Sequence, residues 1–186
     1  MRTVWWEDGT VRLIDQLRLP QEIVTCDCRT AAEVAEAIKS MKLRGAPAIG
    51  IAAAYGLALA ATMPAATVSA LMEQVTSAEG MLRATRPTAV NLAWGLDRML
   101  ATARAATAGG DVSSVRATLL AEAETMADED VAANKAMGSF GAALVPDGAN
   151  ILTHCNAGAL ATVEWGTALG VIRSAHEQGK RLHVWV

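Results

Sequence analysis

Short apolar runs separated by turn residues open the chain, and this spacing is typical of β-strands. Val4–Trp6 and Thr10–Ile14 flank Glu7-Asp8-Gly9, and Asp-Gly is a turn dipeptide that favours a β-hairpin. A further short strand is predicted around Ile23–Cys26. The chain is therefore expected to begin with a small β-hairpin or sheet.

Helical spacing of apolar residues dominates the next part of the chain. Thr30 followed by Glu33 is a capping box, which satisfies free N–H groups at a helix start and predicts a helix over 31–41. Residues 47–61 carry apolar or small side chains on every face, so this helix is predicted to be central. Three more helices are expected over 64–84, 89–106 and 112–137, the first opened by Pro64 and the others capped by Thr88 and Asp111.

After Pro146-Asp147-Gly148 the pattern changes from all-helix to strand, helix, strand. The runs at 149–154 and 182–186 are predicted to be parallel strands joined by a crossover, the first of them buried. Two strands do not make a stable doubly wound sheet by themselves. The predicted fold class is α/β. A mainly helical domain with a small sheet is expected over 1–145, and the beginning of a truncated Rossmann-like parallel α/β domain over 146–186.

Composition narrows the function classes. The net charge is −3 and no basic run occurs, which disfavours nucleic acid as a partner. No signal peptide is evident, and the most apolar run, 46–61, is shorter than the roughly 20 residues that span a bilayer. The three cysteines, an odd number, suit a reducing compartment. A soluble cytoplasmic protein without a membrane partner is therefore expected.

The segment Arg44-Gly45-Ala46-Pro47 has the features of an anion site. It places a guanidinium and a glycine just ahead of a predicted helix start, where free N–H groups and the helix dipole attract phosphate. Arg86 precedes another helix start and could supply a second cation. The alternative, an ordinary helix-start loop with an exposed arginine, is about equally compatible with the spacing.

Cys155 follows the predicted strand at 149–154 and precedes Asn156-Ala157-Gly158, which is predicted to be a tight turn before a helix. Such a strand-loop-helix junction forms the floor of ligand crevices in open α/β sheets. A thiol there would face the positive end of the next helix, which favours the thiolate. The alternative is a buried, inert cysteine, because free cysteines are often buried.

No metal site is predicted. Cys26 and Cys28 lack a second Cys/His pair at zinc spacing, and strand alternation would place both on one face, in the core. The predicted long helix carries five acidic residues, for which a solvated helix face is a better explanation than a metal cluster. They are Glu122, Glu124, Asp128, Glu129 and Asp130.

Longer segments of the chain carry a family resemblance. They are Asp15-Gln16-Leu17, Arg44-Gly45-Ala46-Pro47-Ala48-Ile49-Gly50, Arg86-Pro87-Thr88-Ala89-Val90-Asn91-Leu92, Thr153-His154-Cys155-Asn156-Ala157-Gly158-Ala159-Leu160-Ala161-Thr162 and Trp165-Gly166-Thr167-Ala168-Leu169-Gly170-Val171-Ile172. In this order the chain resembles the methylthioribose-1-phosphate isomerase family, which is related to the regulatory subunits of eukaryotic initiation factor 2B. The resemblance covers essentially the whole chain.

The resemblance implies a helical domain followed by a Rossmann-like domain, assembled as a homodimer. It implies an aldose–ketose isomerisation in methionine salvage, from 5-methylthio-ribose 1-phosphate to 5-methylthio-ribulose 1-phosphate, without a metal or organic cofactor. The family's phosphate and sugar contacts map onto Arg44, Gly45, Ala46 and Arg86, and its catalytic cysteine maps onto Cys155. Whether hydrogen moves through an enediol or as a hydride is left open.

One departure from the family pattern qualifies this expectation. The family's second catalytic residue, an aspartate, lies downstream of the strand on which this sequence stops. The chain is therefore expected to need the missing C-terminal half of the enzyme and to be inactive alone. Three alternatives stay open: a related isomerase acting on 5-deoxyribose 1-phosphate or ribose 1,5-bisphosphate, a non-catalytic module like the initiation-factor subunits, and a structural remnant whose only role is dimerisation.

Overall fold

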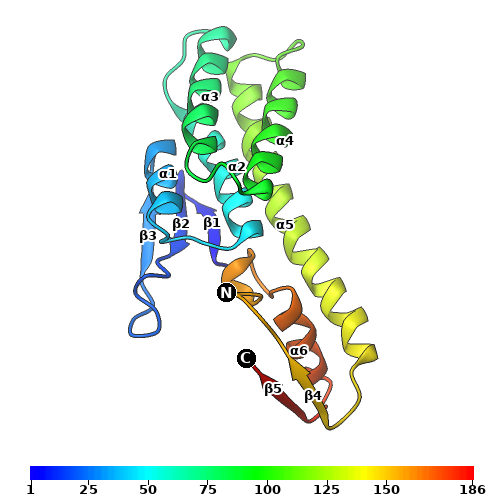
Figure 1. The fold of residues 1–186 in the computed structure, drawn as a ribbon. Helices are drawn as coiled ribbons and strands as arrows, with labels where there is room; N and C mark the ends of the chain where they lie inside the picture. The colour runs from blue at the N-terminus through cyan, green and yellow to red at the C-terminus, as the bar shows by residue number, and fades with distance from the viewer.

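The computed structural model describes residues 1–186, which form a helical body on one side of a small sheet and a lower α/β part (Figure 1). The elements are β1 (Val4–Glu7), β2 (Thr10–Ile14), β3 (Thr25–Cys28), α1 (Ala31–Lys39), α2 (Ala46–Thr62), α3 (Val68–Arg83), α4 (Val90–Ala106), α5 (Val112–Leu144), β4 (Ala149–Leu152), the 3₁₀ turn η1 (Ala159–Ala161), α6 (Ala168–Glu177) and β5 (Leu182–Trp185). The predicted α/β class, with a mainly helical first part, is confirmed.

Strands β1, β2 and β3 form an antiparallel sheet in chain order. The predicted hairpin is confirmed: Asp8 and Gly9 both have positive φ (49° and 74°), as primed two-residue hairpin turns require. Strand β3 begins two residues later than predicted, at Thr25. Val24 still belongs to the loop between β2 and β3, and its carbonyl accepts the Asp15 N–H where that loop begins. One face of the sheet packs against helices α1 and α2.

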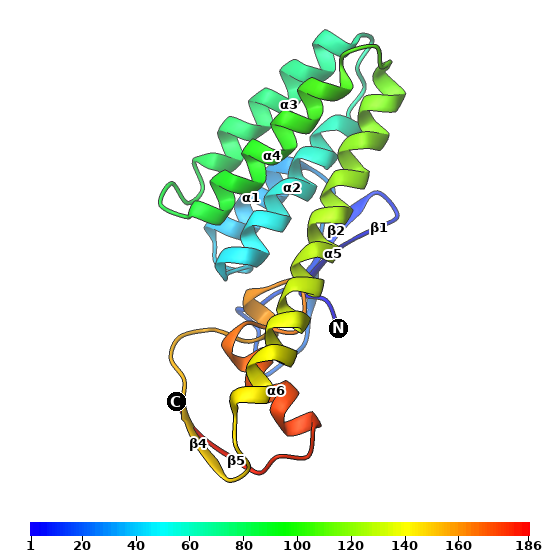
Figure 2. The same cartoon turned by 90° about the vertical axis from the view of Figure 1, so that its right-hand side faces the viewer.

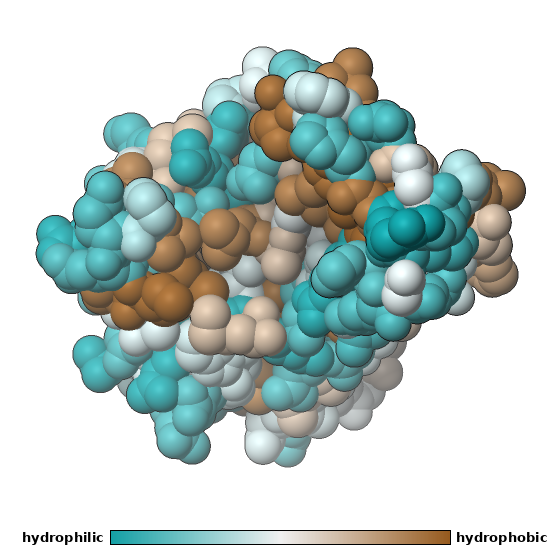
Figure 3. Space-filling model, turned by 90° about the horizontal axis from the view of Figure 1, so that it is seen from below, coloured by the Kyte–Doolittle hydropathy of each residue, from teal (hydrophilic) through white to brown (hydrophobic).

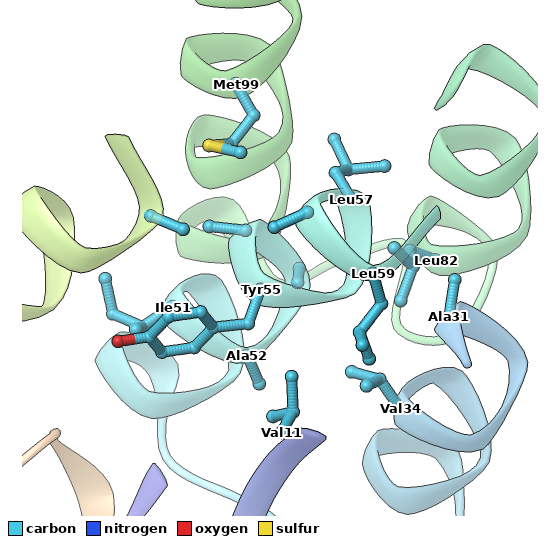
Figure 4. Close-up of a cluster of buried hydrophobic side chains, with 14 of the residues drawn as sticks. Val11, Ala31, Val34, Ile51, Ala52, Tyr55, Leu57, Leu59, Leu82 and Met99 are labelled. Carbon is cyan, nitrogen blue, oxygen red and sulfur yellow. The ribbon is translucent and has the colours of Figure 1, made fainter. Parts of the chain in front are cut away.

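Helix α2 is the centre of the fold, as predicted from its apolar faces. Every residue from Ala48 to Ala61 is buried, and the helix contacts α1, α3, α4, α5 and the sheet. Figure 4 shows this packing: Tyr55 and Leu59 of α2 lie among side chains from the sheet and from the surrounding helices, Val11 and Val34 among them. The N-terminus of α2, which carries Ala46, is thus held firmly in place.

Glycines allow α2 and α4 to approach each other closely. A methyl group on Gly95 of α4 would lie 2.6 Å from the Gly50 carbonyl oxygen of α2. A methyl group on Gly50 would lie 2.7 Å from the Asn91 carbonyl oxygen. Both distances are far below van der Waals contact, so the crossing depends on these residues. The crossing fixes the N-terminus of α2 relative to the turn that precedes α4.

Replacing Gly95 by alanine is expected to destabilise the protein by about 1–3 kcal/mol, because backbone atoms of α2 must move to admit the methyl group. Gly80 of α3 is the matched control, since a methyl group there meets nothing within 4 Å. Gly80→Ala should stabilise the protein by up to about 1 kcal/mol through helix propensity. Urea unfolding measures both changes, and equal shifts for the two variants would contradict the close crossing.

The predicted start of α3, the predicted cap of α4 and the predicted end of α5 differ from the structure. Helix α3 begins at Val68 because the Thr67 hydroxyl caps it by accepting the Ala70 N–H, so Pro64 lies in the preceding loop. Thr88 does not cap α4, whose N-cap is Ala89 without a side-chain hydrogen bond. Helix α5 is capped by Asp111 as predicted, but it continues to Leu144 instead of ending at Met137.

Strands β4 and β5 pair in parallel, as predicted, and α6 lies between them in the chain. The prediction of a buried strand over 149–154 is wrong in two respects. Strand β4 ends at Leu152, and Leu152 is 81% exposed because one face of this two-stranded sheet is open to solvent. The predicted helix directly after Gly158 is only the short turn η1, and α6 begins at Ala168.

Helix α5 joins the two parts of the structure (Figure 2). Its first half contributes Val115, Leu119 and Met126 to the helical core. Its second half lies against α6, so closely that a methyl group on Gly141 would be 2.6 Å from Val171. We propose the domain boundary between residues 145 and 146, just after this helix ends. None of the helices is both long enough and apolar enough to cross a membrane.

Candidate active site at the junction of the two parts

A cavity of about 660 Å³ lies where the helical part meets the segment after β4. All five residues singled out from the sequence line it: Arg44, Gly45, Ala46, Arg86 and Cys155. The view from below shows the surface hollowed between two lobes, with apolar residues along its margin (Figure 3). The structure therefore brings together three segments that lie far apart in the sequence.

The Arg44 loop is shaped by Gly45 and by the start of α2. Gly45 is the N-cap of α2 and has φ +105°, a conformation that residues with a Cβ rarely adopt. A Cβ at this position would also lie 2.3 Å from Cα of Ala161. Glycine is thus required both for the backbone turn and for the close approach of η1. The loop carrying the anion-site arginine and the segment after Cys155 are in direct contact here.

Arg86 enters the cavity from the turn between α3 and α4. One guanidinium nitrogen, Nη1, lies 3.5 Å from the Met41 sulfur, a weak acceptor. Neither Arg44 nor Arg86 forms an ion pair, and no Asp or Glu lines the cavity. Two unpaired guanidinium groups beside the N-terminus of α2 make a wall suited to a phosphate group.

Cys155 is exposed and lies in the loop after β4. The alternative of a buried thiol is therefore wrong, and the reactivity of Cys155 stays a prediction. Its backbone has φ +68°, which is uncommon for a residue other than glycine and is found preferentially at functional sites. No helix begins directly after Cys155 in the chain, because the short turn η1 comes first and α6 begins only at Ala168. The N-cap of α6, Thr167, nevertheless lines the same cavity as Cys155.

The other two cysteines are in the small sheet, as predicted. Cys28 is buried and Cys26 is half-buried on the same side of β3. Burial raises the pKa of Cys28 to about 12, and the neighbouring Cys26 adds to this effect. Neither residue lines the cavity, so Cys155 is the thiol available for chemistry there.

The segment after Cys155 is fastened to the helical part by hydrogen bonds. The Thr3 hydroxyl donates to the Ala159 carbonyl at 2.8 Å, and the Thr3 N–H donates to the Val163 carbonyl at 2.7 Å. The Val163 N–H in turn donates to the Asp130 carboxylate of α5 at 2.8 Å. These contacts hold η1 against the Arg44 loop and so define the shape of the cavity.

The acidic residues of α5 are thus not simply a solvated face, which corrects the prediction for Asp130. This carboxyl is half-buried; burial raises its pKa, and hydrogen bonds from the Val163 N–H and from Asn134 partly oppose that effect. Glu122 and Glu129 both pair with Arg98 of α4 at 2.5 Å. No group of three or more His, Cys, Asp or Glu side chains is placed to hold a metal ion.

The remaining lining residues were not singled out from the sequence as site residues. They are Gln16, Leu19, Pro20, Met41, Pro47, Asn156, Leu160, Ala161, Thr162 and Thr167. Several belong to the segments that carry the family resemblance, including Asp15-Gln16-Leu17. That resemblance was a signal for their location, although it gave them no role. Leu19 and Pro20 had no signal, because their place in the wall depends on how the loop after β2 folds back, and Met41 had none because it lies in the turn after α1.

Comparison with known proteins decides the family. Residues 42–186 match the model of the Initiation factor 2 subunit family. The chain belongs to this family. Among its relatives is the methylthioribose-1-phosphate isomerase of Desulforudis audaxviator, 50% identical over 185 residues that cover 100% of this chain and 53% of that protein. The methylthioribose-1-phosphate isomerase of a Synechococcus strain is 52% identical and is likewise covered to 53%.

Two crystal structures of similar proteins have the same fold. The 5-methylthioribose 1-phosphate isomerase from Pyrococcus horikoshii superposes with a TM-score of 0.94 at 44% identity, covering 100% of this chain and 52% of that one. A protein from A. fulgidus described as translation initiation factor eIF-2B, subunit delta, gives a TM-score of 0.88 at 50% identity, covering 99% and 53%. Family members thus carry both kinds of name, and this chain spans about half the length of the relatives it matches.

Proposed function

We propose that this chain supplies the phosphate-binding and thiol half of a sugar-phosphate isomerase that converts 5-methylthio-ribose 1-phosphate into 5-methylthio-ribulose 1-phosphate. The observation that carries the proposal is the meeting of Arg44, Arg86 and Cys155 around one cavity. The names of relatives at about 50% identity support the choice of substrate. The proposed roles are phosphate binding for the Arg44–Ala46 loop and Arg86, and acid–base chemistry for Cys155.

The reaction needs a thiol or carboxyl near the sugar, because phosphate on the anomeric oxygen prevents simple opening to a free aldehyde. The bond between C1 and the ring oxygen breaks, and the ring oxygen takes up a proton. Hydrogen moves from C2 to C1, and the hydroxyl on C2 loses its proton and becomes the ketone. C1 is reduced while C2 is oxidised, so the change is an intramolecular oxidation–reduction that needs no external oxidant.

Cys155 is suited to move one of these protons, since general acids and bases act through a positioned side chain within hydrogen-bond reach. The two arginines neutralise the phosphate and fix the sugar relative to the thiol, which supplies orientation. A second acid–base group is required for the opposite side of the sugar. No carboxylate lines the cavity, so we propose that an aspartate from outside these residues provides it.

The test is an assay of isomerisation with synthetic 5-methylthio-ribose 1-phosphate, using the full-length natural protein and the 186-residue chain side by side. The full-length protein is expected to convert the substrate, and the chain alone is expected to show no turnover above the buffer blank. Binding of the substrate to the chain alone, through the phosphate group of the substrate, should still be measurable by calorimetry. Turnover by the chain alone would contradict the need for a second group, and no turnover by the full-length protein would contradict the proposed function.

The same assay separates the alternatives. Faster conversion of 5-deoxyribose 1-phosphate or ribose 1,5-bisphosphate would indicate a related isomerase with another substrate. A non-catalytic module like the initiation-factor subunits would convert none of the three, and the A. fulgidus relative described as such a subunit is the reason to include this outcome. We further propose that the protein is a homodimer and acts in methionine salvage in the cytoplasm. Sedimentation of the full-length protein tests the homodimer.

A further inference from the structure

Gln16 connects the two loops of the cavity, and neither the sequence motifs nor the proposed chemistry gives it a role. It follows β2 and is only 3% exposed. Its side-chain Nε2 donates to the Leu160 carbonyl at 2.8 Å and to the Arg44 carbonyl at 3.3 Å. Its backbone N–H donates to the Lys42 carbonyl at 2.9 Å. One side chain thus holds the anion loop and the segment after Cys155 at once.

The orientation of this amide is fixed by its neighbours. Both partners are carbonyl oxygens, so the nitrogen must face them and the oxygen must face away. That oxygen, Oε1, is buried and has no donor within hydrogen-bond distance. A buried acceptor without a partner costs about 1–3 kcal/mol, and such groups in native structures often have a functional reason. What distinguishes Gln16 is that this cost is offset by two hydrogen bonds that join different loops of the cavity.

We propose that Gln16 is a positioning residue that sets the distance between a phosphate bound at Arg44 and the thiol of Cys155. Leu160 lies in η1, on the segment that leads from the thiol, and the neighbouring Ala161 touches Gly45. The Gln16 bridge and the Gly45–Ala161 contact together lock the two loops in register. The role of Gln16 in catalysis rests on the proposed function. The coupling between a bound anion and the thiol can be measured without turnover.

Glutamine is suited to this task by its shape and by its hydrogens. Its amide nitrogen carries two N–H groups, one for each carbonyl. Glutamate has the same size but would turn a carboxylate oxygen toward two carbonyl oxygens and repel both. Methionine fills a similar volume without any donor. Both substitutions should therefore loosen the register of the loops while the cavity keeps its arginines and its thiol.

The experiment measures alkylation of Cys155 by iodoacetamide in the protein, followed at this residue by peptide mass spectrometry, as inorganic phosphate is added. In the wild type, phosphate bound at the arginines should slow alkylation. In Gln16→Met, the factor by which saturating phosphate slows alkylation is expected to fall at least about fivefold, the lower end of typical couplings between two sites. In the active full-length protein the same variant should lower kcat by about 10- to 100-fold, as a misplaced group does, with little change in KM.

Gln74→Met is the matched control. Gln74 also donates from Nε2 to one carbonyl, that of Pro64, and also has a buried, unpartnered Oε1, but it lies on α3 away from the cavity. This variant should keep wild-type protection and kcat, and Gln16→Glu serves as the second test variant if Gln16→Met unfolds. Unchanged protection in the folded Gln16 variant would overturn the role of Gln16. Absence of phosphate protection in the wild type would instead contradict the shared anion and thiol site, and with it the proposed function.

Discussion

Replacing Cys155 by alanine is expected to lower kcat of the full-length protein by about 10²- to 10⁴-fold, the usual contribution of a general acid or base. KM should change little, because Arg44 and Arg86 still hold the phosphate. The side chain is exposed and alanine also has a Cβ, so the melting temperature should stay close to that of the wild type. Steady-state kinetics and thermal unfolding of the same preparation measure the three quantities.

Cys26→Ala is the control for this experiment, since it removes a half-buried thiol that lies in β3 and does not line the cavity. It should leave kcat unchanged. Full activity in Cys155→Ala would show that the thiol takes no part in proton transfer. A matching loss in Cys26→Ala would show that the effect comes from the protein's stability.

Replacing Gly45 by alanine is expected to abolish phosphate binding and to destabilise the protein by about 2–5 kcal/mol. Two costs combine: a residue with a Cβ at φ +105° costs about 1–2 kcal/mol, and forcing a methyl group into packed backbone costs about 1–3 kcal/mol more. The methyl group would lie 2.3 Å from Cα of Ala161, so the anion loop and η1 must separate. Urea unfolding and calorimetry with inorganic phosphate measure the two effects.

Gly109→Ala separates these two costs. Gly109 has φ +101°, close to the φ of Gly45, but a methyl group there meets nothing within 4 Å. It should lose only the backbone part of the stability, about 1–2 kcal/mol, and bind phosphate as the wild type does. If Gly45→Ala behaved like Gly109→Ala in both measurements, contact between the loops would not matter for the site.

Local signals in the sequence were enough to predict most elements of the fold. The capping box at Thr30, the Asp-Gly turn and the apolar faces of α2 each depend on neighbours within a few residues, and each is confirmed. The predicted start of α3 at Pro64 was wrong although a local signal existed. Thr67 caps the helix with its side chain, and this signal outweighs the preference of proline for the first helical position.

The features that sequence reasoning missed depend on contacts between distant residues. Gly138 and Gly141 suggest the end of a helix, yet α5 continues through both. They are needed because α6 packs there, with Ser174 2.5 Å from a methyl group built on Gly138. Asp130 is predicted from the sequence to be solvated, whereas in the structure it is half-buried and accepts a hydrogen bond from the Val163 N–H, 33 residues away.

The residues of the candidate site could be singled out from the sequence, but their assembly could not. Arginine and glycine at a helix start, and a thiol after a strand, each predict a site from local sequence. That these segments share one cavity follows from the α2–α4 crossing and from the attachment of η1, which no periodicity reveals. Gln16 shows the limit most clearly, since its two carbonyl partners lie 28 and 144 residues away in the sequence.

The continuous helix α5 restricts which insertions and deletions the protein can tolerate. It runs for 33 residues and contacts the helical core with one end and α6 with the other. One added residue in its middle would advance the far end by about 1.5 Å and rotate it by about 100°, carrying α6 and the thiol loop away from the arginines. Length variation among natural homologues should therefore avoid this helix and collect in turns such as Gly109-Gly110, where added residues leave the register of the two parts intact.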